Sequence, residues 1–406
     1  AKYKINPVVI DHCVGGGVGQ DVRAPNIARV TTLKAGLRKE IPGFTVQCNC
    51  VSSIEALSSA TRLIMAGEAE VVMTGGVEIM SNFPYAIQGS RANKNLRSLE
   101  TVKTKWPELW GAEGVTISDT TEQGLSDPVR LINMAGTAEV CAQMYDVSRQ
   151  EQDLYAHESF KRCVAAEKRG FYATHTYPVV HNGQTLLEAD EYPALRAGLA
   201  EKLALIQKAP VLFDSPAYTF QQFLKQFGHY IEGKRVNGSS KATVTLFNSC
   251  SRSDGAAAAI VTRLSKAKKL GLPVRAIIRS WSYYGNDPAH MGVGPALATN
   301  EALERSGIKF EQLDQIELHE PFAATVLSIF KLGQQKYGHN WQAKWLENRV
   351  NPNGGTLALG HPLAATGLRL LRNLIYAFNE NPSSRYGLIS GCSGGGIGAA
   401  MIFEKG

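Results

Sequence analysis

The chain has 406 residues and a mass of 44.0 kDa, enough for two or three domains. Hydrophobic residues make up 44% and charged residues 19%, a balance that is typical of a globular protein and excludes a disordered one. The net charge of +7 comes without any run of five basic residues, so nucleic-acid binding has little support, and no apolar run reaches the roughly 20 residues of a membrane span.

The N-terminal region is predicted to form a βαβ unit. Residues 26–40 favour a helix and residues 44–49 a short strand. Residues 50–66 have apolar spacing close to 3.6 and predict a second helix, followed by a buried strand at 69–75. Cys50 falls at the junction of strand and helix, where free backbone N–H groups are expected to lower the pKa of a thiol.

Residues 82–241 have a different sequence pattern, in which helical stretches such as 136–169 alternate with polar loops. We predict that they form an inserted domain. Within it, residues 216–231 are expected to form an amphipathic helix with one apolar face, made of Phe220, Phe223, Leu224, Phe227 and Ile231. Two interpretations of that face stay open: it packs on its own domain, or it contacts a partner subunit or a membrane surface.

Regular alternation of strands and helices returns near residue 242. The predicted elements are strand–loop–strand at 242–263, a strand at 274–285, a strand and helix at 315–330, and two strands at 385–405. Segment 44–57 parallels 315–326, and 70–78 parallels 386–396, which indicates a weak internal repeat. The predicted domains are a first half at 1–81 plus 242–264, a loop domain at 82–241, and a second half at 265–406.

The number and spacing of the cysteines favour a reducing compartment. The seven cysteines are an odd number and widely spaced, so they make a poor disulfide framework. Cys48 and Cys50 form a Cys-x-Cys pair without a second pair at zinc-ligand spacing, and we predict no metal site.

Four features suggest nucleophilic chemistry. They are Cys50, His361 between glycine-rich turns, Cys392 before three glycines, and His319-Glu320 at a predicted helix start. Each alone has an ordinary explanation: a buried small side chain, a turn histidine, a plain glycine turn or a charge pair at a helix start. Together they lie at the junctions where α/β sheets place their sites, and a cysteine, a histidine base and a second thiol describe covalent acyl chemistry.

At these residues the chain resembles the thiolase family. The resemblance covers nearly the whole chain and rests on motifs in family order: VQCNCVSSIEAL (46–57), GGVEIMSNFPY (75–85), NMAGTAEVCAQMYDVSRQEQD (133–153), NSCSRSDGAAA (248–258), HEPFA (319–323), GGTLALGHPLAATG (354–367) and CSGGGIGAAMI (392–402). Most thiolases carry Asn-Glu at the HEPFA position. The histidine here is similar to the β-subunits of bacterial and mitochondrial trifunctional fatty-acid oxidation complexes.

The resemblance implies an α/β thiolase fold of two similar layered αβαβα halves with an inserted loop domain. It implies that Cys50 is the nucleophile and His361 its base, that His319 and His361 bind the thioester oxygen, and that Cys392 transfers a proton. The N–H groups of Cys50 and Gly394 would form a second oxyanion hole. Glu320 would support His319, and three further residues would contact substrate or CoA: Met134, Ser249 and Cys250.

The resemblance also implies an activity and partners. The expected reaction is CoA-dependent cleavage of 3-ketoacyl-CoA in fatty-acid β-oxidation, with acyl-CoA and CoA as substrates and no bound cofactor. Two alternatives are synthesis of acetoacetyl-CoA and a catalytically silent thiolase-like subunit. The subtype implies a homodimer or tetramer, association with a hydratase/dehydrogenase α-subunit, and a place in the bacterial cytoplasm or the mitochondrial matrix.

The sequence departs from the family at several positions. Ser53 replaces a glycine after the nucleophile, Gln47 replaces an asparagine before it, and Cys250 replaces a serine that usually touches the CoA pantetheine. These changes bear on substrate fit more than on the chemistry. The family's first strand, with its Arg-Thr-Pro-like turn, has no match, and we expect that the sequence begins after it.

Overall fold

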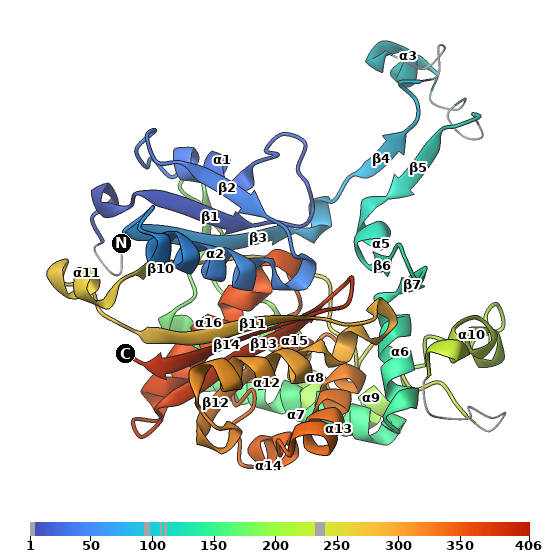
Figure 1. The fold of residues 1–406 in the computed structure, drawn as a ribbon. Coiled ribbons are helices and arrows are strands. Elements are labelled where there is room, and N and C mark those ends of the chain that lie inside the picture. The colour runs from blue at the N-terminus through green and yellow to red at the C-terminus, as the bar shows by residue number, and fades with distance from the viewer. Residues whose placement is uncertain (1–4, 93–97, 106–107, 109–111, 232–239) are drawn as a thin grey trace.

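A computed structural model describes residues 5–92, 98–105, 108, 112–231 and 240–406. Its core holds two four-stranded sheets, one above the other, with helices between them and outside them (Figure 1). Among the described residues, no helix has the length and apolar character that a membrane span needs.

The first sheet has the strand order β10-β3-β1-β2, in which β10 alone runs antiparallel to its neighbour. Its strands are β1 (His12–Gly16), β2 (Gly43–Val46), β3 (Val71–Ile79) and β10 (Asp254–Thr262). Two helices pack against the sheet, α1 (Ile27–Lys34) on the outside and α2 (Ser52–Ala66) on the inside (Figure 1).

The second sheet has the order β11-β14-β13-β12. Its strands are β11 (Ala276–Gly285), β12 (Leu313–Leu318), β13 (Tyr386–Ser393) and β14 (Ile397–Lys405). The helices around it are α12 (Gly294–Ser306), α13 (Ala323–Tyr337), α14 (Trp341–Leu346), α15 (Thr356–Leu359) and α16 (Thr366–Glu380). Helix α11 (Leu264–Lys269) follows β10 and lies beside the first sheet, where Lys266 pairs with Glu70. Helix α16 packs beside α2 in the layer between the sheets (Figure 1). The stack is therefore α–β–α–β–α, as the family resemblance implies.

The inserted region lies between β3 and β10. A two-stranded ribbon, β4 (Tyr85–Gln88) and β5 (Thr116–Asp119), projects from the body and carries α3 (Leu99–Thr104) (Figure 1). The remaining elements are α5 (Thr120–Gly124), β6 (Ser126–Asp127), β7 (Ile132–Asn133), α6 (Met134–Met144), α7 (Arg149–Lys168), β8 (Val179–His181), β9 (Gln184–Leu187), α8 (Tyr192–Glu201), α9 (Leu203–Gln207) and α10 (Phe220–Phe227).

Sheet order shows how the two halves correspond. By position, β10, β3 and β1 match β14, β13 and β12, and α2 matches α16. The predicted match of 70–78 with 386–396 is therefore right, since it pairs β3 with β13. The match of 44–57 with 315–326 is wrong: β2 is an edge strand, whereas β12 takes the place of β1, and the counterpart of β2 is Val350, which bridges to Ile316.

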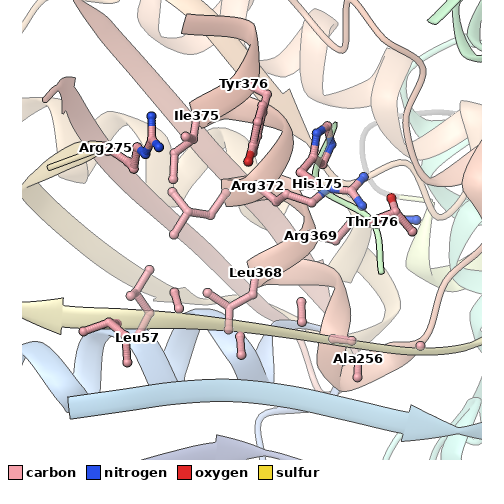
Figure 2. Close-up of a pocket in the computed structure, with 18 of the residues that line it drawn as sticks. Leu57, His175, Thr176, Ala256, Arg275, Leu368, Arg369, Arg372, Ile375 and Tyr376 are labelled. Carbon is pink, nitrogen blue, oxygen red and sulfur yellow. The ribbon is translucent and has the colours of Figure 1, made fainter. Parts of the chain in front are cut away.

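The two halves differ at one edge. Strand β11 pairs with the outer edge of β14, but no strand among the described residues pairs with that edge of β10. A groove of about 1790 Å³ follows this edge and continues along α16 (Figure 2). Apolar side chains such as Leu57 and Leu368 line it, together with Arg369 and Arg372.

Three expected elements differ from the structure. The helix predicted at 26–40 is shorter and ends at Lys34, just before Gly36, which has a left-handed φ of 72°. Of the two strands predicted at 242–263, only β10 forms, and the preceding segment makes isolated bridges instead. The helix predicted at 216–231 is α10, which ends at Phe227 and is followed by a 3-10 turn.

The apolar face of α10 is buried within the same chain. Its members Phe220, Phe223, Phe227 and Ile231 are 0–9% exposed and pack against Ile132, Val140, Phe213 and Ala242 of the inserted region. The face therefore packs on its own domain, and the alternative that it contacts a partner subunit or a membrane loses its basis.

Candidate active site

Cys50 lies in a tight turn between β2 and α2. The turn begins at Asn49, whose φ of 44° is in the left-handed region, where asparagine is better tolerated than most residues. Asn49 Nδ2 donates to the carbonyl of Gly394 at 3.0 Å, and Ser393 Oγ donates to the carbonyl of Cys48 at 2.8 Å. Two hydrogen bonds therefore fix the cysteine turn to the loop between β13 and β14.

The pKa of Cys50 is raised, although the sequence predicted that it would be lowered, because burial outweighs the backbone N–H groups. Burial raises the pKa of the Cys50 thiol to about 12, although hydrogen bonds from the N–H groups of Gly394 and Cys50 act in the opposite direction. The helix itself starts two residues later, at Ser52. Cys50 is therefore a thiol in the resting site and needs a base.

The two histidines converge, as predicted. His319 follows β12 and His361 precedes α16, yet their ring centroids are 4.2 Å apart. The Cys50 sulfur and one ring nitrogen of each histidine all lie within 4.8 Å of one another. Such a thiol–imidazole cluster could also hold a metal ion by geometry alone.

Each histidine is held through Nδ1 by a threonine. His319 Nδ1 lies 3.0 Å from Thr356 Oγ1, and His361 Nδ1 lies 2.7 Å from Thr366 Oγ1. Both Nε2 atoms are buried and have no hydrogen-bond partner in the described structure. Burial lowers the pKa of His361 to about 3 and lowers the pKa of His319 well below its usual value, so both rings are neutral.

Cys392 and Gly394 complete the cluster from the end of β13. Cys392 is buried, and burial followed by the nearby Cys50 raises the pKa of its thiol well above the usual range. The Gly394 N–H points to the Cys50 sulfur. The structure thus brings Cys50, His319, His361 and the Cys392 loop together at the ends of strands from both sheets.

Glu320 lies in a buried polar cluster. Its carboxylate accepts hydrogen bonds from Tyr155 Oη at 2.8 Å, Ser159 Oγ at 2.9 Å and Asn351 Nδ2 at 2.5 Å. A Cβ on Gly355 would clash with this carboxylate, which explains the glycine. Glu320 therefore joins α7 of the inserted region to the loops that carry both histidines.

Glu78 anchors the His361 loop from the other half. At the end of β3, its buried carboxylate accepts from the N–H groups of Gly19 at 2.8 Å and Ala364 at 3.1 Å. A Cβ on Gly76 would clash with the carbonyl of Ala364, so the loop approaches β3 only because residue 76 is glycine.

Comparison with known proteins identifies the family. The family model of the thiolase N-terminal domain matches residues 1–212, and that of the thiolase C-terminal domain matches residues 272–405. The chain belongs to the thiolase family. It is 34% identical over 406 residues to a probable acetyl-CoA acetyltransferase of Escherichia coli, covering 99% of this chain and 88% of that protein. It is 32% identical over 410 residues to the beta-ketothiolase BktB of Cupriavidus necator, covering 100% and 90%.

Solved thiolases share the fold. The human mitochondrial 3-ketoacyl-CoA thiolase superposes with a TM-score of 0.80 at 28% identity, over 99% of this chain and 89% of that one. Its complex with CoA gives a TM-score of 0.79, also at 28% identity, over 100% and 88%. The chain described by our structure is therefore an acyltransferase, and thiolases use CoA as a substrate.

The residues expected to contact substrate or CoA lie at the edges of this thiolase site. Met134 is buried, and its sulfur would be 3.5 Å from a Cβ on Gly394, so it borders the Cys392 loop. Burial, and after it the nearby Cys50, raises the pKa of the Cys250 thiol to about 12. Ser249 is buried with its hydroxyl bonded to the carbonyl of Thr245 at 2.5 Å. Their contacts with CoA stay predictions.

Sequence reasoning missed the side chains that hold the histidines of this thiolase. Thr356 and Thr366 lie inside the recognised GGTLALGHPLAATG motif, but nothing in the spacing assigns them to His319 and His361. Tyr155 and Ser159 lie one turn apart on α7, and that spacing was the available signal.

Proposed function

We propose that this thiolase is a degradative 3-ketoacyl-CoA thiolase, which cleaves its substrate with CoA to acetyl-CoA and a shortened acyl-CoA in fatty-acid β-oxidation. The convergence of Cys50, His319 and His361 beside the Cys392 loop supports thiolase chemistry. The degradative direction is supported by the histidine of HEPFA (319–323), where most thiolases carry Asn-Glu. The proposed division of the chain stays 1–81 with 242–264, 82–241 and 265–406.

The first half-reaction breaks the carbon–carbon bond. The Cys50 thiol transfers its proton to Nε2 of His361 as the sulfur attacks the 3-keto carbon, and the N–H groups of Cys50 and Gly394 stabilise the oxyanion. When that oxyanion collapses, the bond to the acetyl unit breaks and its electrons form the acetyl-CoA enolate. The imidazolium of His361 and His319 stabilise the enolate oxygen, and Cys392 protonates its carbon.

The second half-reaction returns the enzyme to its resting state. Acetyl-CoA leaves, and the Cys392 thiolate takes the thiol proton of an incoming CoA. The CoA thiolate attacks the thioester on Cys50, and the acyl group passes to CoA. The Cys50 thiolate released in this step recovers the proton held on His361. Each oxyanion donor can contribute about 3–4 kcal/mol to the stabilisation of a transition state.

The synthetic direction is the second candidate, because the relatives named above include acetyl-CoA acetyltransferases. The same side chains serve both directions of the reaction, so the two candidates have to be distinguished by the acyl chain length that the enzyme prefers. A catalytically silent subunit is disfavoured because all four reactive side chains are present. The proposed assembly is a homodimer or tetramer with a hydratase/dehydrogenase α-subunit, in the bacterial cytoplasm or the mitochondrial matrix.

A thiolysis assay tests the proposal. Loss of the 3-ketoacyl-CoA enolate absorbance is measured with CoA and substrates of four to sixteen acyl carbons, with the Cys50→Ser variant as a matched control. A degradative enzyme should show its highest kcat/KM on longer chains. Activity confined to the four-carbon acetoacetyl-CoA would favour the synthetic alternative, and no activity at any length would favour the silent subunit.

A further inference from the structure

The hydroxyl of Thr356 connects His319 to a buried arginine. Arg369 Nη2 donates to Thr356 Oγ1 at 3.0 Å, and the same oxygen lies 3.0 Å from His319 Nδ1. Thr356, His319 and Arg369 are 0%, 1% and 9% exposed. Arg369 leaves α16 at the groove shown in Figure 2, and its other guanidinium nitrogen donates to the carbonyl of Gly360 at 2.8 Å. The guanidinium is therefore anchored on both sides.

The direction of the bond between Thr356 and His319 follows from the count of protons. A guanidinium has donors only, so Thr356 Oγ1 accepts from Arg369. The hydroxyl has a single proton of its own, and among the described hydrogen bonds the only acceptor within its reach is Nδ1 of His319. If Nδ1 carried a proton instead, the buried hydroxyl proton would lose its partner, at a cost of about 1–3 kcal/mol.

The second histidine has the opposite arrangement. Thr366 Oγ1 donates its proton to the carbonyl of Pro362 at 3.2 Å, one helical turn back, and so can accept from Nδ1 of His361 at 2.7 Å. Thr366 has no arginine donor in the described hydrogen bonds. A neutral imidazole carries one N–H, so the threonine partner of each ring determines which nitrogen holds it.

We infer that Arg369 and Thr356 are positioning residues that hold His319 in the tautomer with its proton on Nε2, whereas Thr366 leaves Nε2 of His361 unprotonated. Two chemically identical side chains thereby receive different tasks. His319 faces the site as a hydrogen-bond donor for an oxyanion, and His361 faces it as the base for Cys50. The catalytic roles of the two histidines rest on the proposed thiolase reaction, whereas their tautomers follow from the hydrogen bonds alone.

Nitrogen NMR of the resting enzyme tests the tautomers directly. Protein labelled with 15N-histidine is measured without substrate, and the signals of His319 are assigned by their loss in His319→Asn. We expect an N–H type signal at Nε2 of His319 and at Nδ1 of His361. An N–H at Nδ1 of His319, or a charged ring, would overturn the inference.

Variants test the positioning role through activity. Thr356→Val keeps the shape but loses the hydroxyl, and it should lower kcat for thiolysis by about 10- to 100-fold. Thr356→Ser should stay within about threefold of the wild type, as should Thr325→Val, a matched control that removes another buried threonine hydroxyl.

The background of His319→Asn separates positioning from general damage. Without the imidazole, Thr356→Val should lower kcat by less than about threefold more. A loss as large as in the wild type would refute the positioning role. If the wild-type chain shows no thiolysis while the NMR signals are as expected, the proposed function fails and the tautomer assignment stands.

Discussion

At the scale of single residues, the nucleophile and its base meet as neutral groups. Burial disfavours charge on both, so the pKa of Cys50 rises to about 12 while the pKa of His361 falls to about 3. A resting thiolate–imidazolium pair would require the reverse of both shifts. Proton transfer is therefore coupled to the arrival of the substrate, whose carbonyl oxygen takes up the negative charge beside the N–H groups of Cys50 and Gly394.

This neutral pair predicts the pH dependence of alkylation. Because the thiolate is the reactive form and the pKa of Cys50 is raised, the thiolate fraction should grow throughout the neutral and mildly basic range. The rate of iodoacetamide labelling at Cys50 without substrate should rise about tenfold per pH unit between roughly pH 7 and pH 9. Peptide mass mapping separates this label from label on Cys48. A plateau within that range would contradict the raised pKa.

His319 gives a second prediction, because its role is to donate rather than to carry charge. His319→Ala should lower kcat by about 10²–10³-fold, the usual cost of one oxyanion donor. His319→Asn should be tolerated better, since the amide also donates. Steady-state thiolysis kinetics measure both, and thermal melting checks that the fold is intact. Equal losses in the two variants would argue that the ring acts through something other than donation.

At the scale of elements, strand β12 carries a buried acid that does no chemistry in the proposed mechanism. Glu317 accepts one hydrogen bond, from Asn373 Nδ2 at 3.3 Å, and its Oε1 has no partner in the described structure. Burial raises the pKa of Glu317 to about 8, so the folded protein holds this proton more tightly than the unfolded chain. The stabilisation is complete below about pH 4.5 and is lost as the pH rises through about 8.

Glu317→Gln should remove that pH dependence. The variant should unfold with about the wild-type free energy at about pH 4 and be more stable than the wild type at about pH 9, with the difference growing by up to roughly 1.4 kcal/mol per pH unit between about pH 4.5 and about pH 8. Urea unfolding at both pH values measures it, and the exposed Glu188→Gln serves as the matched control. A variant that is less stable at pH 9 would mean that the charged carboxylate is stabilised by partners.

Most helices and strands and the reactive side chains could be predicted from the sequence. The predictions failed where the structure or the pKa of a residue depends on contacts between distant segments. The alternation of strands and helices locates β3, α2 and β13, because local patterns determine them. The pKa of Cys50 depends on its burial between the two halves, and no local sequence pattern predicts that burial. The first of the two strands expected at 242–263 does not form, and the residues before β10 make isolated bridges to Val211, Phe322 and His361 instead.

At the scale of the whole molecule, the duplication explains where the nucleophile and base lie. Cys50 precedes α2 and His361 precedes α16, and these helices occupy equivalent places in the two halves and pack side by side (Figure 1). The junctions before them therefore meet at one end of the central layer. Neither half alone holds both groups, so the site depends on how the halves and the inserted region are joined.

Glu320 allows one of these connections to be tested, the one between the inserted region and the His319 loop. Its carboxylate binds Tyr155 and Ser159 of α7 on one side and Asn351 on the other, and it directly follows His319. Removing both α7 hydroxyls, in Tyr155→Phe with Ser159→Ala, leaves a buried carboxylate with fewer donors. We expect the free energy of unfolding to fall by about 1–3 kcal/mol and kcat to fall by about tenfold, because the His319 loop loses its anchor.

Tyr283→Phe is the matched control for that double variant. Its hydroxyl is paired with Ser58 Oγ at 2.8 Å, in contact with α2 rather than with the histidine loops. It should lower the free energy of unfolding, measured by urea titration, and leave kcat unchanged. The two variants are compared at a temperature where both are fully folded. If the α7 double variant then also keeps its full kcat, Glu320 joins the inserted region to the second half for stability alone and does not position His319.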